Sequence, residues 1–318
     1  MATSGTTSLS ATRNTIIRGA FRLLGFKKNG GVRPAQEVLD AEQSLNTMLK
    51  SWQAMDIGLW LNREYTLYTD KSTSTSYSIG PSGDEATLSP QETAIATAAS
   101  SGATTIVVDS GTNIADDDNI GIVLDDGTLQ WTTVSSGGTT TSIVIAAALT
   151  DDAAVDNPVY NYTTIAPRPL EIIEARLNNA DGNDIIINIV SRNEYMDMTD
   201  KSSTGSPNQI YYDPQLTDGV MNVWPISDNV QQQIKFTGKV PIEIFSAHGN
   251  SPELPDEWMS ALTYNLADWL IPEYPGRISP IDASRITKRA KGYLDTVSSF
   301  DGNSSSFFIS PSRTSDGY

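Results

Sequence analysis

The chain contains no cysteine and a single histidine, His248, among its 318 residues. The absence of cysteine excludes disulfides, thiol nucleophiles and cysteine-ligated zinc. A lone histidine in a loop of Gly and Ser, without a nearby nucleophile motif, gives no sign of a catalytic triad. The sequence also lacks a GxxxxGK[ST] phosphate loop and an HExxH zinc pair. We therefore predict no catalytic residues, no resident metal and no cofactor, and expect that the protein is not an enzyme.

Long apolar runs are also missing. No stretch of 18 or more apolar residues occurs, so we expect no transmembrane segment. The first residues are small and polar, which gives no sign of an export signal. Basic residues are scarce, because 21 Lys and Arg face 38 Asp and Glu and the net charge is −17. Tight DNA binding needs clustered positive charge, so we expect at most a surface along which DNA passes without being specifically bound.

Between Lys71 and Arg168 there is no Lys, Arg or His at all, and this step in composition indicates a domain boundary. The segment carries twelve acids: Asp84, Glu85, Glu92, Asp109, Asp116, Asp117, Asp118, Asp125, Asp126, Asp151, Asp152 and Asp156. Short Thr-, Val- and Ile-rich runs at 104–108, 119–124, 129–134, 142–146 and 159–162 predict strands. Asp125-Asp126-Gly127 is a hairpin signal. These strands predict a small antiparallel barrel or sandwich.

Two groups of acids are candidates for cation binding or for glycoside cleavage. Asp116-Asp117-Asp118 could offer oxygen ligands to Ca²⁺, but the spacing matches no EF-hand loop, and a solvated turn is the alternative. Glu171 and Glu174 form a nominal carboxylate pair of the kind that cleaves glycosides, but their separation is a three-dimensional quantity. Neither pattern predicts a site on its own.

Helices are predicted on both sides of the acidic segment. Apolar residues recur at three- and four-residue steps over 8–25, 34–55, 255–271 and 280–297. The helix opened by Glu253-Leu254-Pro255-Asp256 carries Pro at its start and acids in its first turn. Core positions predicted from these patterns are Trp52, Trp258, Leu262, Leu266 and Trp269. Together with the strand runs they predict an α+β fold: a helical bundle with a small antiparallel sheet, plus an all-β barrel or sandwich.

Basic side chains follow helical steps near both ends of the chain. They are Arg13, Arg18 and Arg22 in the first helix and Arg285, Lys288 and Arg289 in the last. They form either solvated faces or surfaces for an acidic partner. Beyond residue 299 the sequence is rich in Ser, Asn and Gly, which cannot pack alone. Its apolar triplet, Phe307-Phe308-Ile309, is either an anchor on another chain or part of a frayed terminus.

Seven stretches, in the same order, resemble the head-to-tail adaptor proteins of short-tailed bacteriophages, also called tail accessory factors. They are IIRGAFRLLGF, PAQEVLDAEQSLNTMLKSWQAMDIGLW, SYSIGPSGD, RPLEIIEARL, IVSRNEYMDM, GSPNQIYYDPQLTDGVMNVWP and ELPDEWMSALTYNLADWLIPEY. The resemblance implies a structural ring, expected to hold twelve copies, between the portal protein and the tail nozzle protein. DNA would pass through its axis. The expected location is the head-tail junction of the virion, after assembly in the host cytoplasm.

The acidic segment is where this chain departs from the family, because in simpler members the IGPSGD-like turn runs almost directly into the RPLEII-like strand. We therefore expect an adaptor core at 1–84 and 167–299, an inserted β-domain at 85–166 and a flexible tail at 300–318. Two other functions stay open. The insert could bind tail fibres or a glycan, with Trp131, Tyr160 and Tyr162 either stacking on the ligand or lying in the core. The protein could also be a cell-wall hydrolase with a carboxylate pair in a cleft.

Overall fold

A computed structural model describes residues 12–26, 34–55, 61–69, 74–179, 182–247, 249–251 and 254–300. The chain forms two compact units. The helical unit contains Met1–Trp60 and Ile242–Tyr318, and the β unit contains Leu61–Pro241. The prediction of a helical bundle with a small sheet is wrong, because the structure is mostly β, with an eight-stranded sheet, a six-stranded barrel and about 28% helix. The short strands on both sides of the barrel pair with one another and form one large sheet.

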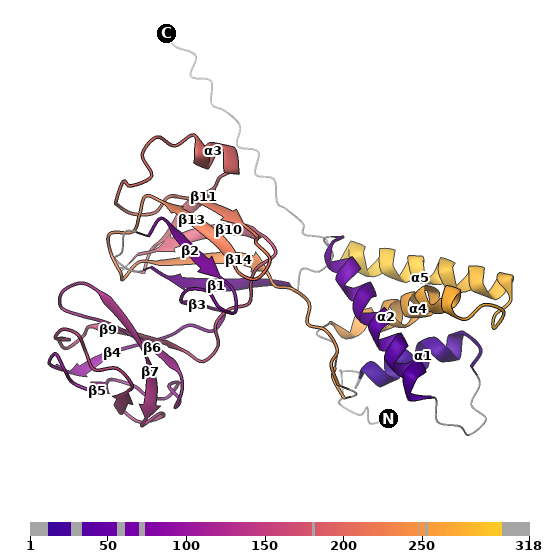
Figure 1. Cartoon of the computed structure of the whole chain (residues 1–318), viewed down its shortest axis with the longest axis horizontal. Coiled ribbons are helices and arrows are strands. Elements are labelled where there is room, and N and C mark those ends of the chain that lie inside the picture. Colours follow the sequence, from indigo (N-terminus) through magenta and orange to yellow (C-terminus); the bar gives the residue numbers. More distant parts are fainter. Residues whose placement is uncertain are drawn as a thin grey trace, which may run out of the picture. The chain divides into compact units, whose positions relative to one another are not determined.

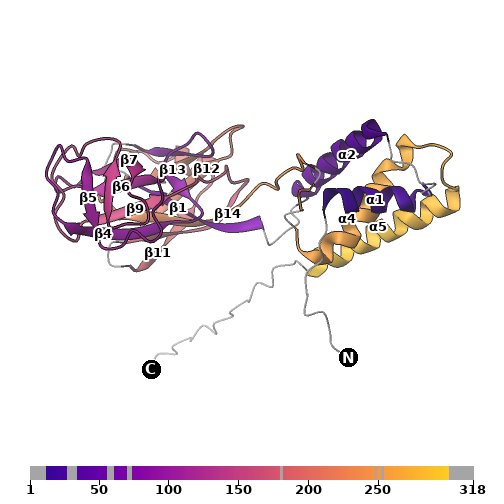
Figure 2. The same ribbon diagram turned by 90° about the horizontal axis from the view of Figure 1, so that it is seen from below.

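The helical unit brings the two ends of the chain together. Its helices are α1 (Arg13–Leu23), α2 (Ala35–Gln53), α4 (Met259–Leu270) and α5 (Pro280–Phe300). Short 3-10 turns at Asp256–Trp258 and Ile271–Glu273 flank α4. In both views the indigo N-terminal helices lie beside the C-terminal ones (Figures 1 and 2), and α4 contacts α1, α2 and α5. Helix α4 is therefore the centre of this unit.

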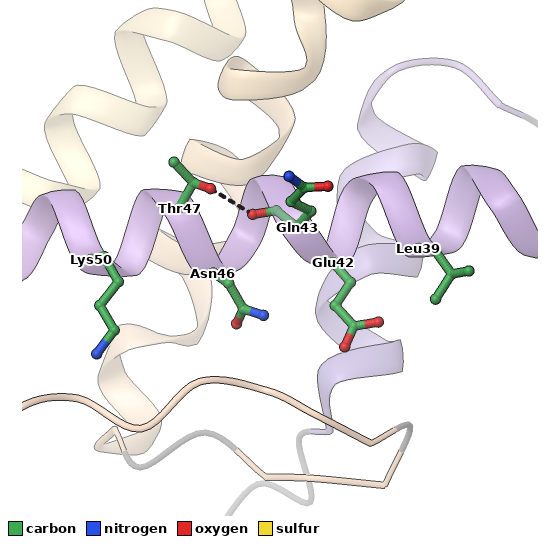
Figure 3. Close-up of a pocket in the computed structure, with 6 residues that line it drawn as sticks. All are labelled: Leu39, Glu42, Gln43, Asn46, Thr47 and Lys50. Carbon is green, nitrogen blue, oxygen red and sulfur yellow. Dashed lines mark hydrogen bonds between the residues drawn. The ribbon is translucent and has the colours of Figure 1, made fainter.

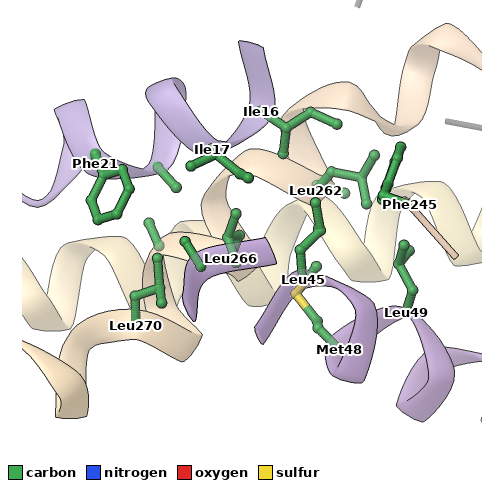
Figure 4. Close-up of a cluster of buried hydrophobic side chains, with 14 of the residues drawn as sticks. Ile16, Ile17, Phe21, Leu45, Met48, Leu49, Phe245, Leu262, Leu266 and Leu270 are labelled. Carbon is green, nitrogen blue, oxygen red and sulfur yellow. The ribbon is translucent and has the colours of Figure 1, made fainter. Parts of the chain in front are cut away.

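The core of the helical unit is a single apolar cluster that α1, α2 and α4 share (Figure 4). Leu262, Leu266 and Leu270 repeat every four residues along α4 and are completely buried, so their side chains form one stripe. Trp52 of α2 meets Trp258 with ring centroids 5.8 Å apart. Burial of each such side chain contributes roughly 1.5–3 kcal/mol.

The β unit is built on an eight-stranded sheet in the order β2-β13-β12-β11-β10-β14-β1-β3. The strands are β1 (Asn62–Tyr68), β2 (Ser76–Ile79), β3 (Ala86–Thr87), β10 (Ile172–Asn178), β11 (Asp184–Ile189), β12 (Gln209–Asp213), β13 (Gly219–Trp224) and β14 (Gln233–Lys239). All neighbours are antiparallel except β11 and β12. Strands before and after the acidic segment thus belong to the same sheet.

Alternation of side chains sets the inner face of this sheet. On β14, Ile234 and Phe236 point to the buried side, and they pair with Leu67 and Tyr65 of β1. The rings of Tyr65 and Phe236 stack with centroids 4.8 Å apart. A short helix, α3 (Arg192–Met196), follows β11 and has the capping box that Ser191 and Glu194 predict. The Ser191 side chain accepts from the Glu194 amide, and the Glu194 carboxylate accepts from the Ser191 amide.

The acidic segment folds into a closed barrel in the order β4-β5-β8-β7-β6-β9. Its strands are β4 (Gln91–Thr97), β5 (Thr105–Val108), β6 (Asn119–Val123), β7 (Leu129–Ser136), β8 (Ser142–Ile145) and β9 (Pro158–Tyr162). Alternate Ile and Val side chains fill it, for example Ile120 and Ile122, both completely buried. Closure leaves no free strand edges within the barrel.

Two connections between barrel and sheet run side by side. The amide of Ala166 donates to the carbonyl of Ala86 at 2.7 Å. Ala86 itself lies in β3, which pairs with β1. The Thr87 hydroxyl donates to the Thr164 carbonyl at 3.0 Å. The barrel therefore leaves and rejoins the sheet at one place.

Candidate functional site

The basic residues of α1 do not form the single surface that the sequence predicts. Arg18 and Arg22 are exposed, but Arg13 is 1% exposed and forms an ion pair with Glu42 of α2. Its backbone amide donates to the Asn250 carbonyl at 2.9 Å. Arg13 was predicted as an interface residue, and the structure corrects this: its charge is used inside the helical unit, because a buried guanidinium needs a carboxylate partner.

The basic residues of α5 lie together on the face opposite its core side. Arg285, Lys288 and Arg289 are exposed, as is Lys291, whereas Ile286 and Ala290 are buried. Arg285 donates to Asp282 at 3.0 Å. Ile281 adds an apolar side chain that is 67% exposed at the start of the same face. We call the exposed residues Ile281, Arg285, Lys288, Arg289 and Lys291 the α5 face.

An aromatic pair adjoins the α5 face. Tyr264 of α4 and Tyr293 of α5 have ring centroids 5.1 Å apart, and Arg289 donates to the Tyr264 hydroxyl at 3.2 Å. The hydrogen bond fixes the direction of the Arg289 side chain. The face therefore combines an oriented arginine with adjoining aromatic area, and Arg and Tyr are both enriched at protein contact surfaces.

Of the predicted core residues, Trp52, Trp258, Leu262 and Leu266 are buried. Trp269 is 43% exposed, so its assignment to the core is corrected. The buried stripe of α4 continues from Leu266 to Leu270, and Trp269 lies one residue, about 100° around the helix, to the side. Predicted interface residues Phe307, Phe308 and Ile309 lie outside the described residues, and so does His248.

A groove of about 510 Å³ runs along α2 and is lined by Leu39, Glu42, Gln43, Asn46, Thr47 and Lys50 (Figure 3). Its polar side chains form hydrogen bonds to the backbone of residues 242–245. The Asn46 amide donates to the Phe245 carbonyl at 3.0 Å and accepts from the Phe245 amide at 2.9 Å. Lys50 donates to the Ile242 carbonyl. These side chains hold residues 242–245 against α2, and we call this set of hydrogen bonds the α2 clip.

Sequence reasoning missed this clip. Its only signal is a polar series, Asn46, Lys50 and Gln53, at helical steps beside the apolar stripe of α2. Gln53 completes it by accepting from the Ile242 amide at 3.1 Å. Such a series is usually a solvated helix face, and its extended partner is almost 200 residues away in the sequence.

The aromatic residues considered for ligand stacking are packed inside the β unit. Tyr160 and Tyr162 are each 2% exposed and belong to one cluster with Tyr68 of β1 and Val230. Trp131 is partly buried against the same cluster, with its ring 5.2 Å from that of Tyr68. The Tyr160 and Tyr162 rings are therefore core residues and are not accessible to a glycan, whereas Trp131 is only partly covered.

Burial between the barrel and the sheet raises the pKa of both Glu85 and Tyr160. The Tyr162 hydroxyl donates to the Glu85 carboxylate. Burial raises the pKa of Glu85 above its ordinary value, and Asp84 adds to the rise, although the hydrogen bond from Tyr162 acts in the opposite direction. Burial, with help from Glu92, raises the pKa of Tyr160 to about 12. The Tyr160 hydroxyl therefore stays protonated near neutral pH, and the Glu85 carboxyl holds its proton to a higher pH than an exposed glutamate does.

The acids considered for cation binding hold turns instead. Asp118 is buried and its Oδ2 accepts from the Ala115 amide at 2.7 Å, while Asp116 accepts from the Gly138 amide at 2.8 Å. Within the described residues, no group of three or more His, Asp or Glu side chains could hold a metal ion. Glu171 and Glu174 are both exposed, and Glu174 accepts from Thr237.

No helix in the described part of the chain has the length and apolar character required to cross a bilayer. Comparison with models of known protein families gave no match. Comparison with curated proteins gave no similar sequence either.

Proposed function

We propose that this protein is a structural connector of a short-tailed phage virion, which forms a ring between the portal protein and the tail nozzle around the DNA channel. In this role it carries out no catalytic step, and it works by contact with copies of itself and with neighbouring proteins. Assembly takes place in the host cytoplasm, and the finished ring lies at the head-tail junction.

The observation that carries the proposal is the α5 face. Four exposed cations of α5, Arg285, Lys288, Arg289 and Lys291, lie beside an exposed Ile281 and outnumber the two exposed acids of the same helix. Arg289 is already oriented by Tyr264. Arg289 therefore costs little to order on binding, and the positive charge of the face suits an acidic protein surface.

The position of the family-like stretches supports the same role. Those at the chain ends coincide with α1, α2 and α4, and those at 168–177 and 205–225 coincide with β10, β12 and β13. They therefore cover both units and leave out the barrel.

The test is addition of the purified protein to purified portal rings, followed by native mass spectrometry. We expect the portal mass to rise by a fixed number of copies, twelve if the family's stoichiometry applies. R285E/K288E should weaken the addition. R63E/R192E, which makes the same change in net charge at exposed sites of the β unit, should not. A portal mass that stays unchanged at any ratio of the two proteins would contradict the proposal.

A further inference from the structure

Net charge is divided unequally between the two units. The helical unit contains 13 Lys and Arg and 14 Asp and Glu, which gives −1. The β unit contains 8 Lys and Arg and 24 Asp and Glu, which gives −16. Nearly all of the net negative charge therefore belongs to the β unit, while the helical unit has clustered positive charge on α5. The cation cluster on α5 is therefore opposite in sign to the β unit.

The barrel surface is negative throughout, because all its charged side chains are acids. Several are held outward by the backbone. Asp125 accepts from the Ala154 amide at 3.0 Å and from Asn157 at 2.8 Å, and Asp152 accepts from the Ser101 amide at 2.7 Å. Asp125 and Asp152 are also joined by a backbone hydrogen bond of 2.9 Å. Their carboxylates are exposed and fixed, so they can meet a partner without losing much conformational freedom.

The α5 face has the complementary properties. It carries four exposed cations, and two exposed acids of α5 lie beside them: Asp282, which pairs with Arg285, and Asp295. The cations still outnumber the acids, so the face keeps a positive charge. A nucleic acid would also offer negative charge, but the β unit of −16 would repel a polyanion over the whole length of the complex.

We propose that the α5 face of one copy docks against the acidic barrel of a second copy of this chain. This contact joins two different surfaces of identical molecules, so it is heterologous and propagates head to tail until a ring closes. The inference deepens the proposed connector function by naming the contact between copies, but its test uses no portal. If the chain does not associate with itself, this inference fails, and addition to portal rings still tests the connector function separately.

Salt should affect this contact in two opposing ways. At about 0.01 M salt the Debye length is about 30 Å, so two molecules of −17 repel each other as whole bodies. At about 0.1 M the length falls to about 10 Å, which screens distant charges but leaves facing charges attracted. At about 1 M both effects are screened, at about 3 Å. Association should therefore be strongest at intermediate salt.

Sedimentation velocity of the full chain across these salt concentrations tests the proposal with charge-reversal variants. R285E/K288E alters the α5 face, and E92K/D109K alters two exposed barrel acids. We expect each variant alone to associate about tenfold or more weakly than the wild type. An equal mixture of the two should regain association, because each then offers the charge that the other lacks. The matched control R63E/R192E should associate like the wild type.

Three results would overturn the proposal. The first is no association of the wild type at any salt concentration. The second is an equal loss in R63E/R192E, which would mean that only net charge matters. The third is a DNA duplex that binds the wild type but not R285E/K288E in fluorescence anisotropy, while the self-association of that variant equals that of the wild type. That result would assign the α5 face to nucleic acid. Circular dichroism of each variant checks that its fold is intact, and a variant that fails is replaced by K288E or D109K alone.

Discussion

Two buried tyrosine hydroxyls, those of Tyr65 and Tyr68, have no hydrogen-bond partner among the described residues. A buried polar group without a partner costs about 1–3 kcal/mol. We therefore expect Tyr65→Phe and Tyr68→Phe to leave the free energy of unfolding unchanged or to raise it by about 1 kcal/mol. Urea unfolding followed by circular dichroism measures this.

Tyr212 is the control for this prediction, because its hydroxyl donates to the Pro169 carbonyl at 2.6 Å. Tyr212→Phe removes the donor and leaves that carbonyl unpaired, so it should lower stability by about 1 kcal/mol. If all three substitutions lower the free energy of unfolding equally, the hydroxyls of Tyr65 and Tyr68 are hydrogen-bonded, and the prediction is wrong.

Glu85 should give the β unit a specific dependence on pH. Its pKa is raised in the folded chain above the ordinary value of 4.5, mainly by burial. A folded state that binds the proton more tightly is stabilised below pH 4.5, and this contribution is lost as the pH rises through the raised pKa. Glu85→Gln keeps an acceptor for Tyr162 and carries no charge, so it escapes this loss.

We accordingly expect the melting temperature of Glu85→Gln, relative to the wild type, to rise between pH 4.5 and pH 7. Differential scanning calorimetry at several pH values gives the difference directly. Glu171→Gln changes an exposed carboxylate and should show a flat difference over the same range. A relative melting temperature that falls with pH would contradict the assigned pKa direction.

At the scale of secondary structure, the clip on α2 determines whether residues 242–245 stay attached. Asn46 makes two hydrogen bonds to Phe245, each contributing about 0.5–1.5 kcal/mol. Asn46→Ala should therefore raise the hydrogen-exchange rate of the Phe245 amide at least about tenfold. Thr47→Ala changes the next residue, whose hydroxyl bonds only within α2, and should leave that rate unchanged.

The elements show how far sequence patterns reach. The hairpin at Asp125-Asp126-Gly127 was predicted correctly and joins β6 to β7. Strand β4 was missed, because Ile95 is its only fully buried residue and the strand is otherwise Ala, Thr, Gln and Glu. The sheet was predicted too small, because pairing of β1 with β14 joins residues more than 160 positions apart, and local patterns contain no such information.

The candidate surfaces were predicted in part. Exposure of Arg285, Lys288 and Arg289 follows from the helical period of α5. Burial of Arg13 does not, because its partner Glu42 lies on a different helix and only packing brings them together. The spacing of a basic residue therefore predicts the face of its own helix on which it lies. It does not predict whether another helix covers that face.

For the whole molecule, the unequal charge predicts two unfolding transitions with different responses to salt. The β unit, at −16, is destabilised by its own repulsion, and the helical unit, at −1, is not. Raising the salt from about 0.01 M to about 0.1 M should raise the melting temperature of the β-unit transition only. Calorimetry measures both transitions.

Asn46→Ala assigns the transitions, because it should lower the melting temperature of the helical unit alone. A single cooperative transition in every buffer would mean that the two units unfold together. Equal salt responses would mean that charge distribution within the units, and not their net charge, governs stability.

Adjacent entry and exit strands have an evolutionary consequence. Since Ala86 and Ala166 are hydrogen-bonded neighbours, a gene that loses the intervening codons could be rejoined by a short turn with the eight-stranded sheet retained. The excision would uncover Tyr68 and Val230, which the barrel now shields. Polar replacements at these two positions would cover the exposed surface, so the sheet itself needs few compensating mutations when this module is gained or lost.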